Sequence, residues 1–87
     1  MNPEAARGYR EEELRAALAT DPRVGEPELV VVLTDDAVIV RGVVPTEDRR
    51  GQVGEVMREL APDLEFVDAL EVATTFPRPR GGGEPVA

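Results

Sequence analysis

The side chains in this sequence that could carry chemistry are carboxylates, and several of them are adjacent. The chain of 87 residues holds 18 Asp and Glu against 10 basic residues, all Arg, and contains no His, Cys, Ser or Lys. Neighbouring carboxylates at positions 11–13, and again at Glu47 and Asp48, could serve general acid–base catalysis. Both groups fall in the first turn of a predicted helix, where the helix dipole favours acidic residues. Because the usual nucleophiles and bases are missing, we predict that the chain is not an enzyme.

Four aspartates form a second candidate site, for a hard cation. Asp35 and Asp36 are the main candidates and could act with Asp63 and Asp68, because carboxylate oxygens suit hard cations. Their spacing does not match an EF-hand loop, and Asp is also a residue that tight turns favour. The turn is the preferred interpretation, so we expect neither a metal centre nor a cofactor.

A glycine pair raises the question of nucleic-acid binding. The segment Gly51-Gln52-Val53-Gly54 follows two arginines and matches the Gly-x-x-Gly loop with which KH domains clamp a nucleic-acid backbone. Here the segment lies inside a helical apolar pattern in which Val53 is needed for the core. The net charge of −8 also opposes binding to phosphates. We therefore expect no nucleic-acid partner.

The elements that must position these residues follow from periodicity and turn residues. Helix formers predict a helix from about Tyr9 to Asp21-Pro22, with residues 1–8 flexible before it. β-Branched runs predict strands over 28–34 and 37–44, joined by a tight turn at 35–36. Thr46 is a good N-cap for an amphipathic helix that ends near Pro62. Residues 64–76 contain a third strand, and the Pro/Gly-rich tail, 77–87, is predicted to be disordered.

The predicted order of elements is α-β-β-α-β, which defines an α+β fold. The hairpin is antiparallel, and the strand–helix–strand crossover places its two strands parallel. We therefore predict a mixed three-stranded sheet with two helices packed on one face, in a single domain over residues 9–76.

The hairpin is apolar on both of its sides, which is unusual for a sheet covered on one face. If Leu29, Val31, Leu33, Val38, Val40 and Val44 face the helices, strand alternation turns four other apolar residues outward. These four residues are Val30, Val32, Ile39 and Val43. Such a patch predicts an interaction face for a protein partner or a second copy of the chain. The alternatives are that the chain from Phe76 folds back over the face, or that the valines are simply exposed.

The same residues carry a resemblance to a known family. The matching positions are Leu18, Asp21-Pro22, Leu29, Val31, Leu33, Asp35, Val38, Val40, Gly42, Val44, Val56, Leu60, Leu64, Val67, Leu70 and Val72. This pattern, over about residues 10–73, resembles the BON domain, a bacterial module named after osmotically induced and nodulation proteins. The chain departs from the family at Asp36, Asp63 and Asp68, where Gly, Gly and Asn are usual. The resemblance implies a non-catalytic module associated with phospholipid surfaces or, in one cytoplasmic type, with potassium.

Together these observations predict a small, non-enzymatic binding module. Its first residues lack the apolar stretch of ~7–15 residues that marks a secretory signal, so we expect a cytoplasmic protein. The preferred function is protein–protein interaction or self-association through the open sheet face. The alternative is peripheral phospholipid binding, and a cation-binding domain is the third interpretation.

Overall fold

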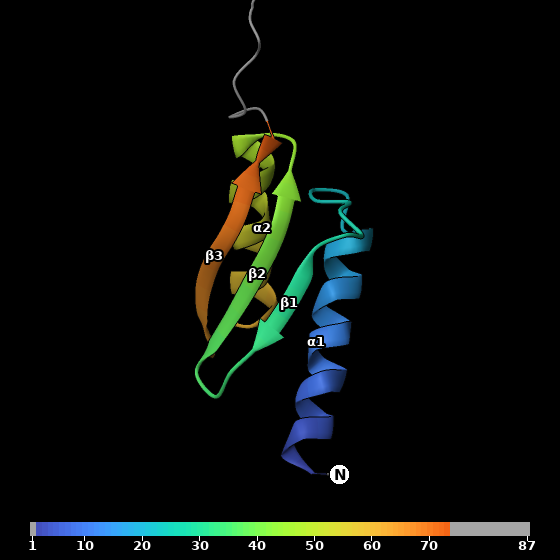
Figure 1. Ribbon diagram of the computed structural model, residues 1–87, viewed down its shortest axis with the longest axis vertical. Coiled ribbons are helices and arrows are strands. Elements are labelled where there is room, and N and C mark those ends of the chain that lie inside the picture. Colours follow the sequence, from blue (N-terminus) through green and yellow to red (C-terminus); the bar gives the residue numbers. More distant parts are fainter. Residues whose placement is uncertain (1, 74–87) are drawn as a thin grey trace, which may run out of the picture.

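The computed structural model describes residues 2–73 and confirms the predicted order of elements. The elements are α1 (Pro3–Thr20), β1 (Val30–Leu33), β2 (Ala37–Val44), α2 (Glu47–Leu60) and β3 (Glu65–Val72). The three strands form one sheet in the order β1-β2-β3, with β1 antiparallel and β3 parallel to β2 (Figure 1). The mixed α+β fold expected from the sequence is therefore present.

The core lies between one side of the sheet and the two helices. In Figure 1, α2 lies behind β2 and β3, while α1 runs beside β1. The two helices contribute to one buried cluster together with alternate residues of all three strands. The helical members include Leu14, Leu18, Val53, Val56 and Met57, and the strand members are Val31, Leu33, Val38, Val40, Val44, Leu70 and Val72. Within residues 2–73, the other side of the sheet carries no helix.

Helix α1 begins earlier than the sequence analysis predicted. The expectation that residues 1–8 precede the helix is wrong, because α1 starts at Pro3. The Asn2 side chain accepts a hydrogen bond from the Ala5 amide at 2.7 Å, and Pro3 occupies the first helical position. Asparagine at the N-cap followed by proline is a strong helix start. At the other end, Asp21 caps the helix as expected. The predicted tail, 77–87, lies outside the described residues.

The hairpin and the second helix follow local signals closely. Thr34 at the end of β1 accepts a hydrogen bond from the Ala37 amide through its hydroxyl, which closes the turn at Asp35 and Asp36. Thr46 is the N-cap of α2 and accepts a hydrogen bond from the Arg49 amide at 3.0 Å. These contacts fix the two ends of β2, the central strand on which both neighbouring strands pair.

One glycine is required by the packing of the sheet. Gly42 in β2 has φ of 141°, in the region that favours glycine. A Cβ at this position would lie 2.6 Å from Cδ2 of Leu29, which is buried in the core. The missing side chain therefore makes room for Leu29 as the chain enters β1.

Candidate functional site

The side of the sheet that faces away from the helices, here called the outer face, is the strongest candidate site, and Figure 1 is viewed toward it. It bears the four residues predicted for it, Val30, Val32, Ile39 and Val43. Val30 and Val43 are 43% and 50% exposed, and Val32 and Ile39 are half-buried. Their neighbours in sequence, such as Val31 and Val40, are buried against the helices, as strand alternation requires.

Strand pairing brings these residues into register across the sheet. Val32 pairs with Ile39, and Ile39 pairs with Val67 of β3. These three side chains form a continuous line over all three strands, here called the apolar row. Val67 is 37% exposed, whereas Val32 and Ile39 are half-buried, so each residue of the row keeps part of its surface accessible. Because contiguous exposed apolar surface is common at interaction sites, this row makes the outer face the candidate site.

Charged side chains stand at defined positions around the apolar row. Arg41 lies in β2 between Val30 and Ala69, whereas Glu65 lies in β3 beside Ala37. Glu71 lies farther along β3, beside Val43. The side chains of Arg41, Glu65 and Glu71 are exposed and form no ion pair within residues 2–73. As far as the described part of the chain shows, the outer face thus offers one unpaired cation and two unpaired anions next to apolar surface.

Sequence reasoning missed the contribution of β3 to the outer face. Val67 and Ala69 point outward because Phe66, Asp68 and Leu70 occupy the alternate positions on the helix side. The alternation of Phe66, Leu70 and Val72 was the available signal. It required a decision about where the third strand begins, and the sequence left that start open.

At each edge of the sheet, a carboxylate accepts a hydrogen bond from a backbone amide of the edge strand. The Glu11 side chain on α1 accepts the Leu33 amide of β1 at 2.8 Å. On the opposite edge, Asp68 accepts the Leu70 amide of β3 at 2.9 Å and also pairs with Arg50 of α2. Edge amides are the groups to which a foreign strand would add. These contacts occupy the Leu33 and Leu70 amides, so neither amide is free to pair with an added strand.

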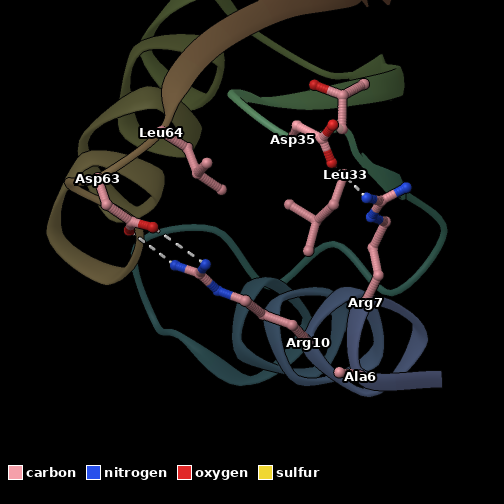
Figure 2. Close-up of a pocket in the computed structure, with 8 residues that line it drawn as sticks. Ala6, Arg7, Arg10, Leu33, Asp35, Asp63 and Leu64 are labelled. Carbon is pink, nitrogen blue, oxygen red and sulfur yellow. Dashed lines mark hydrogen bonds and ion pairs between the residues drawn. The ribbon is translucent and has the colours of Figure 1, made fainter. Parts of the chain in front are cut away.

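A shallow cavity of about 280 Å³ lies between α1, the hairpin turn and the start of β3. Figure 2 shows Leu33 and Leu64 pointing toward it between two ion pairs. Arg7 pairs with Asp35 at 2.6 Å, and Arg10 forms two hydrogen bonds to Asp63. The charged groups around this cavity therefore form ion pairs with one another. These ion pairs connect the first half of α1 to the hairpin turn and to the start of β3.

The structure places the cation candidates in these ion pairs and in the turn. Asp35 and Asp63 are paired with arginines, and the Asp36 side chain accepts a hydrogen bond from the Thr34 hydroxyl. The hydrogen bonds from Arg10 hold the pKa of Asp63 below its ordinary value. Across residues 2–73, no group of three or more metal-ligating side chains comes together. The four aspartates are therefore not gathered into one cation site.

Three of the carboxylates considered for acid–base chemistry, Glu11, Glu12 and Glu47, form structural contacts. Glu11 holds the edge of β1, and Glu12 pairs with Arg15, whose hydrogen bonds lower the pKa of Glu12. In α2, Glu47 lies 3.6 Å from Arg50, and its neighbour Asp48 lies beside it in the first helical turn.

The Gly-x-x-Gly segment is helical. Gly51 and Gly54 both belong to α2, and Val53 between them is fully buried. A Cβ on Gly54 would lie 3.3 Å from the Phe66 ring, so this glycine allows α2 to approach β3 closely. The segment forms no loop that could clamp a nucleic-acid backbone.

No family model, no curated protein and no solved structure matches this chain. The resemblance to the BON domain therefore stays a prediction carried by the residues quoted for it. Of the helices in residues 2–73, neither is long and apolar enough to cross a membrane.

Proposed function

We propose that this protein is a non-enzymatic binding module that contacts another protein through the outer face of its sheet. The apolar row carries the proposal, because Val32, Ile39 and Val67 form one apolar line that neither α1 nor α2 covers. Partially exposed β-branched residues in register lose unfavourable water contact when a second surface covers them. The chain supplies the helices for one side of the sheet, and a partner would supply the cover for the other.

The charge of the molecule favours a protein over a membrane as this partner. Peripheral helices that bind anionic lipid carry a basic face and bulky apolar anchors. This chain has a net charge of −8, and Glu65 and Glu71 border the outer face. A neutral lipid surface remains the alternative occupant, and it can be separated from a protein by experiment.

The test places a photoreactive amino acid at Val43 on the outer face and, in a matched control, at Glu55 on the exposed side of α2. The full chain is illuminated both in purified form and in extract of its source cells, and adducts are identified by mass spectrometry. We expect a defined protein adduct, either the chain itself or one other protein, from position 43 and none from position 55. Adding the substitution Ile39→Lys to the chain labelled at position 43 should remove this adduct. Equal labelling from both positions would contradict the proposal.

A vesicle experiment decides between protein and lipid. The purified chain is centrifuged with vesicles of phosphatidylcholine alone and with vesicles that also contain phosphatidylglycerol. We expect the chain to stay in the supernatant with both. Pelleting with both vesicle types, lost in Ile39→Lys, would replace the protein partner with a lipid surface.

A further inference from the structure

We propose that the partner of the outer face is a second copy of this chain, bound face to face in a two-fold symmetric dimer in which Arg41 of each copy pairs with Glu65 of the other. This inference rests on the proposed function, since it names the occupant of the same face.

The apolar row supplies the symmetry axis. Val32, Ile39 and Val67 lie opposite one another across the three strands. A two-fold axis that runs along this row, between the two sheets, places each of these side chains against its own counterpart. The strands of the two sheets then run in opposite directions, which suits the aligned packing of two sheets about 10 Å apart.

The same axis brings opposite charges together. Arg41 and Ala37 lie on β2 at equal distances in sequence from Ile39, on either side of it. Rotation about the apolar row therefore places Arg41 of one copy over Ala37 of the other. Ala37 pairs in register with Glu65 of its own sheet, so the guanidinium lies next to that carboxylate. Symmetry produces this contact twice.

The alanines leave space for the charged side chains. On β3, Glu65 and Ala69 lie at equal distances in sequence from Val67, so the axis places Glu65 over Ala69 of the other copy. Each long charged side chain of this central region thus faces an alanine. The arrangement complements itself in size as well as in charge, as an interface between identical copies must.

Other two-fold arrangements of the outer face fit less well. An axis along β2, or across the sheet through Arg41, places the two Arg41 side chains against each other. An axis between Arg41 and Val43 brings Arg41 beside Glu71 of the other copy, because Glu71 pairs with Val43. That arrangement leaves the apolar row outside the contact. Of these arrangements, only the axis along the apolar row both buries the row and places Arg41 next to a carboxylate of the other copy.

The edges and the size of the face define the kind of dimer. Because Glu11 and Asp68 occupy amides at the two sheet edges, pairing through the faces is favoured over the addition of strands. Interfaces that bury less than roughly 1,200 Å² in total are typical of weak, transient complexes, and a three-stranded face is a small contact surface. We therefore expect a reversible dimer.

The test is sedimentation equilibrium of the purified full chain up to about 1 mM, the upper end of weak association. The variants are Arg41→Glu, Glu65→Arg, the double variant with both changes, and Glu71→Arg as the matched control. All three positions are exposed, and circular dichroism and the thermal midpoint check that each variant is folded. The double variant keeps the net charge of −8, so its behaviour reports the pair and not the total charge.

We expect a monomer–dimer equilibrium whose dissociation constant rises at least about tenfold in each single variant of the pair and returns to within about threefold in the double variant. Glu71→Arg should change it less than about threefold. The proposal would be overturned if the chain is a strict monomer, or if the dissociation constant does not change in the Arg41 and Glu65 variants. It would also be overturned if Glu71→Arg alone abolishes the dimer. If the purified chain is a monomer while position 43 still labels a different protein, the dimer fails and the proposed function stands.

Discussion

At the scale of single residues, Gly42 shows how a missing side chain can determine packing. Its φ of 141° is costly for any residue with a Cβ, and the space beside it is filled by Leu29. Leu29 is 2% exposed and cannot move outward without opening the core. Gly42 belongs to the residues that resemble the BON pattern, and the physical reason for a glycine there is the close approach of Leu29 just before β1.

Gly42→Ala should therefore destabilise the protein by about 1–3 kcal/mol, from backbone strain together with overpacking. The urea midpoint of unfolding, followed by circular dichroism, measures the change. Gly51→Ala is the matched control, because nothing lies within 4 Å of a Cβ built there and the residue is in the interior of α2. That variant should gain up to about 1 kcal/mol. If Gly42→Ala left the urea midpoint unchanged, the role assigned to the contact with Leu29 would be contradicted.

Asp63 provides a prediction about pH. The hydrogen bonds from Arg10 lower the pKa of Asp63 below its ordinary value of 3.8, so the unfolded chain binds a proton more readily than the folded one. The contribution of this pair is fully present above that value and is lost as the pH falls through the lower pKa of the folded state. Asp63→Asn should therefore destabilise the protein at neutral pH, with the difference from wild type disappearing under strongly acidic conditions.

The measurement is the thermal midpoint of both proteins over a pH series. Arg10→Gln serves as the partner control, because removing the guanidinium should abolish most of the effect of Asp63→Asn in the double variant. A stability difference that stays constant across the pH series would show that the pair does not stabilise Asp63 in its charged form.

At the scale of elements, the edges of the sheet are held by side chains from outside β1 and from within β3. Glu11 reaches from α1 to the Leu33 amide, and Asp68 turns back on its own strand to the Leu70 amide. Carboxylates on an edge also repel the approach of another acidic chain. The helix that covers the core thus also protects the strand beside it.

Glu11→Ala should release the edge of β1. A hydrogen bond to a charged group contributes about 1.5–3 kcal/mol, so the Leu33 amide should exchange with solvent at least about tenfold faster. Hydrogen exchange followed by nuclear magnetic resonance measures this amide directly. Glu13→Ala, an exposed neighbour on the same helix, should leave the exchange of Leu33 unchanged. Similar rates in both variants would mean that the Glu11 contact does not protect the strand.

Local signals and the crossover rule predicted the elements and the direction of their pairing, but not the register of β3 or all of the bounds. Thr46, the aspartates at 35–36 and the β-branched runs act over a few residues, so the hairpin and α2 were correct. The start of α1 was wrong because the Asn2-Pro3 signal was overlooked beside the acidic run at 11–13. The outward position of Val67 depends on pairing with β2, a contact between residues far apart in the chain. No local pattern specifies such a register.

The apolar residues of the candidate site were predicted from the sequence, but the arrangement of charged residues around them was not. Val30, Val32, Ile39 and Val43 follow from alternation along a hairpin, which a sequence displays directly. The positions of Arg41 and Glu65 relative to the apolar row depend on which residues of β3 pair with β2. The sequence predicts an apolar patch, and the structure adds the arrangement of charge around it.

At the scale of the whole molecule, net charge acts against self-association. Two copies of a chain with a net charge of −8 repel each other at distances where salt screens strongly, whereas contacts within an interface are screened less. The proposed dimer should therefore tighten, by roughly tenfold or more, between about 0.02 M and 0.15 M salt. Sedimentation equilibrium at two salt concentrations measures this, and a dimer that weakens with added salt would contradict the balance of charges described here.

The space that Gly42 leaves for Leu29 has one more consequence. Three consecutive valines, 30–32, precede Leu33, and a run of near-identical residues carries little information against slippage of one strand along another. A shift by a single residue would exchange the wet and dry sides of β1. Because Leu29 fits only beside the glycine, the space at Gly42 fixes the register of β1 against β2. A position on the helix side of the sheet thereby decides which valines the molecule presents to its surroundings.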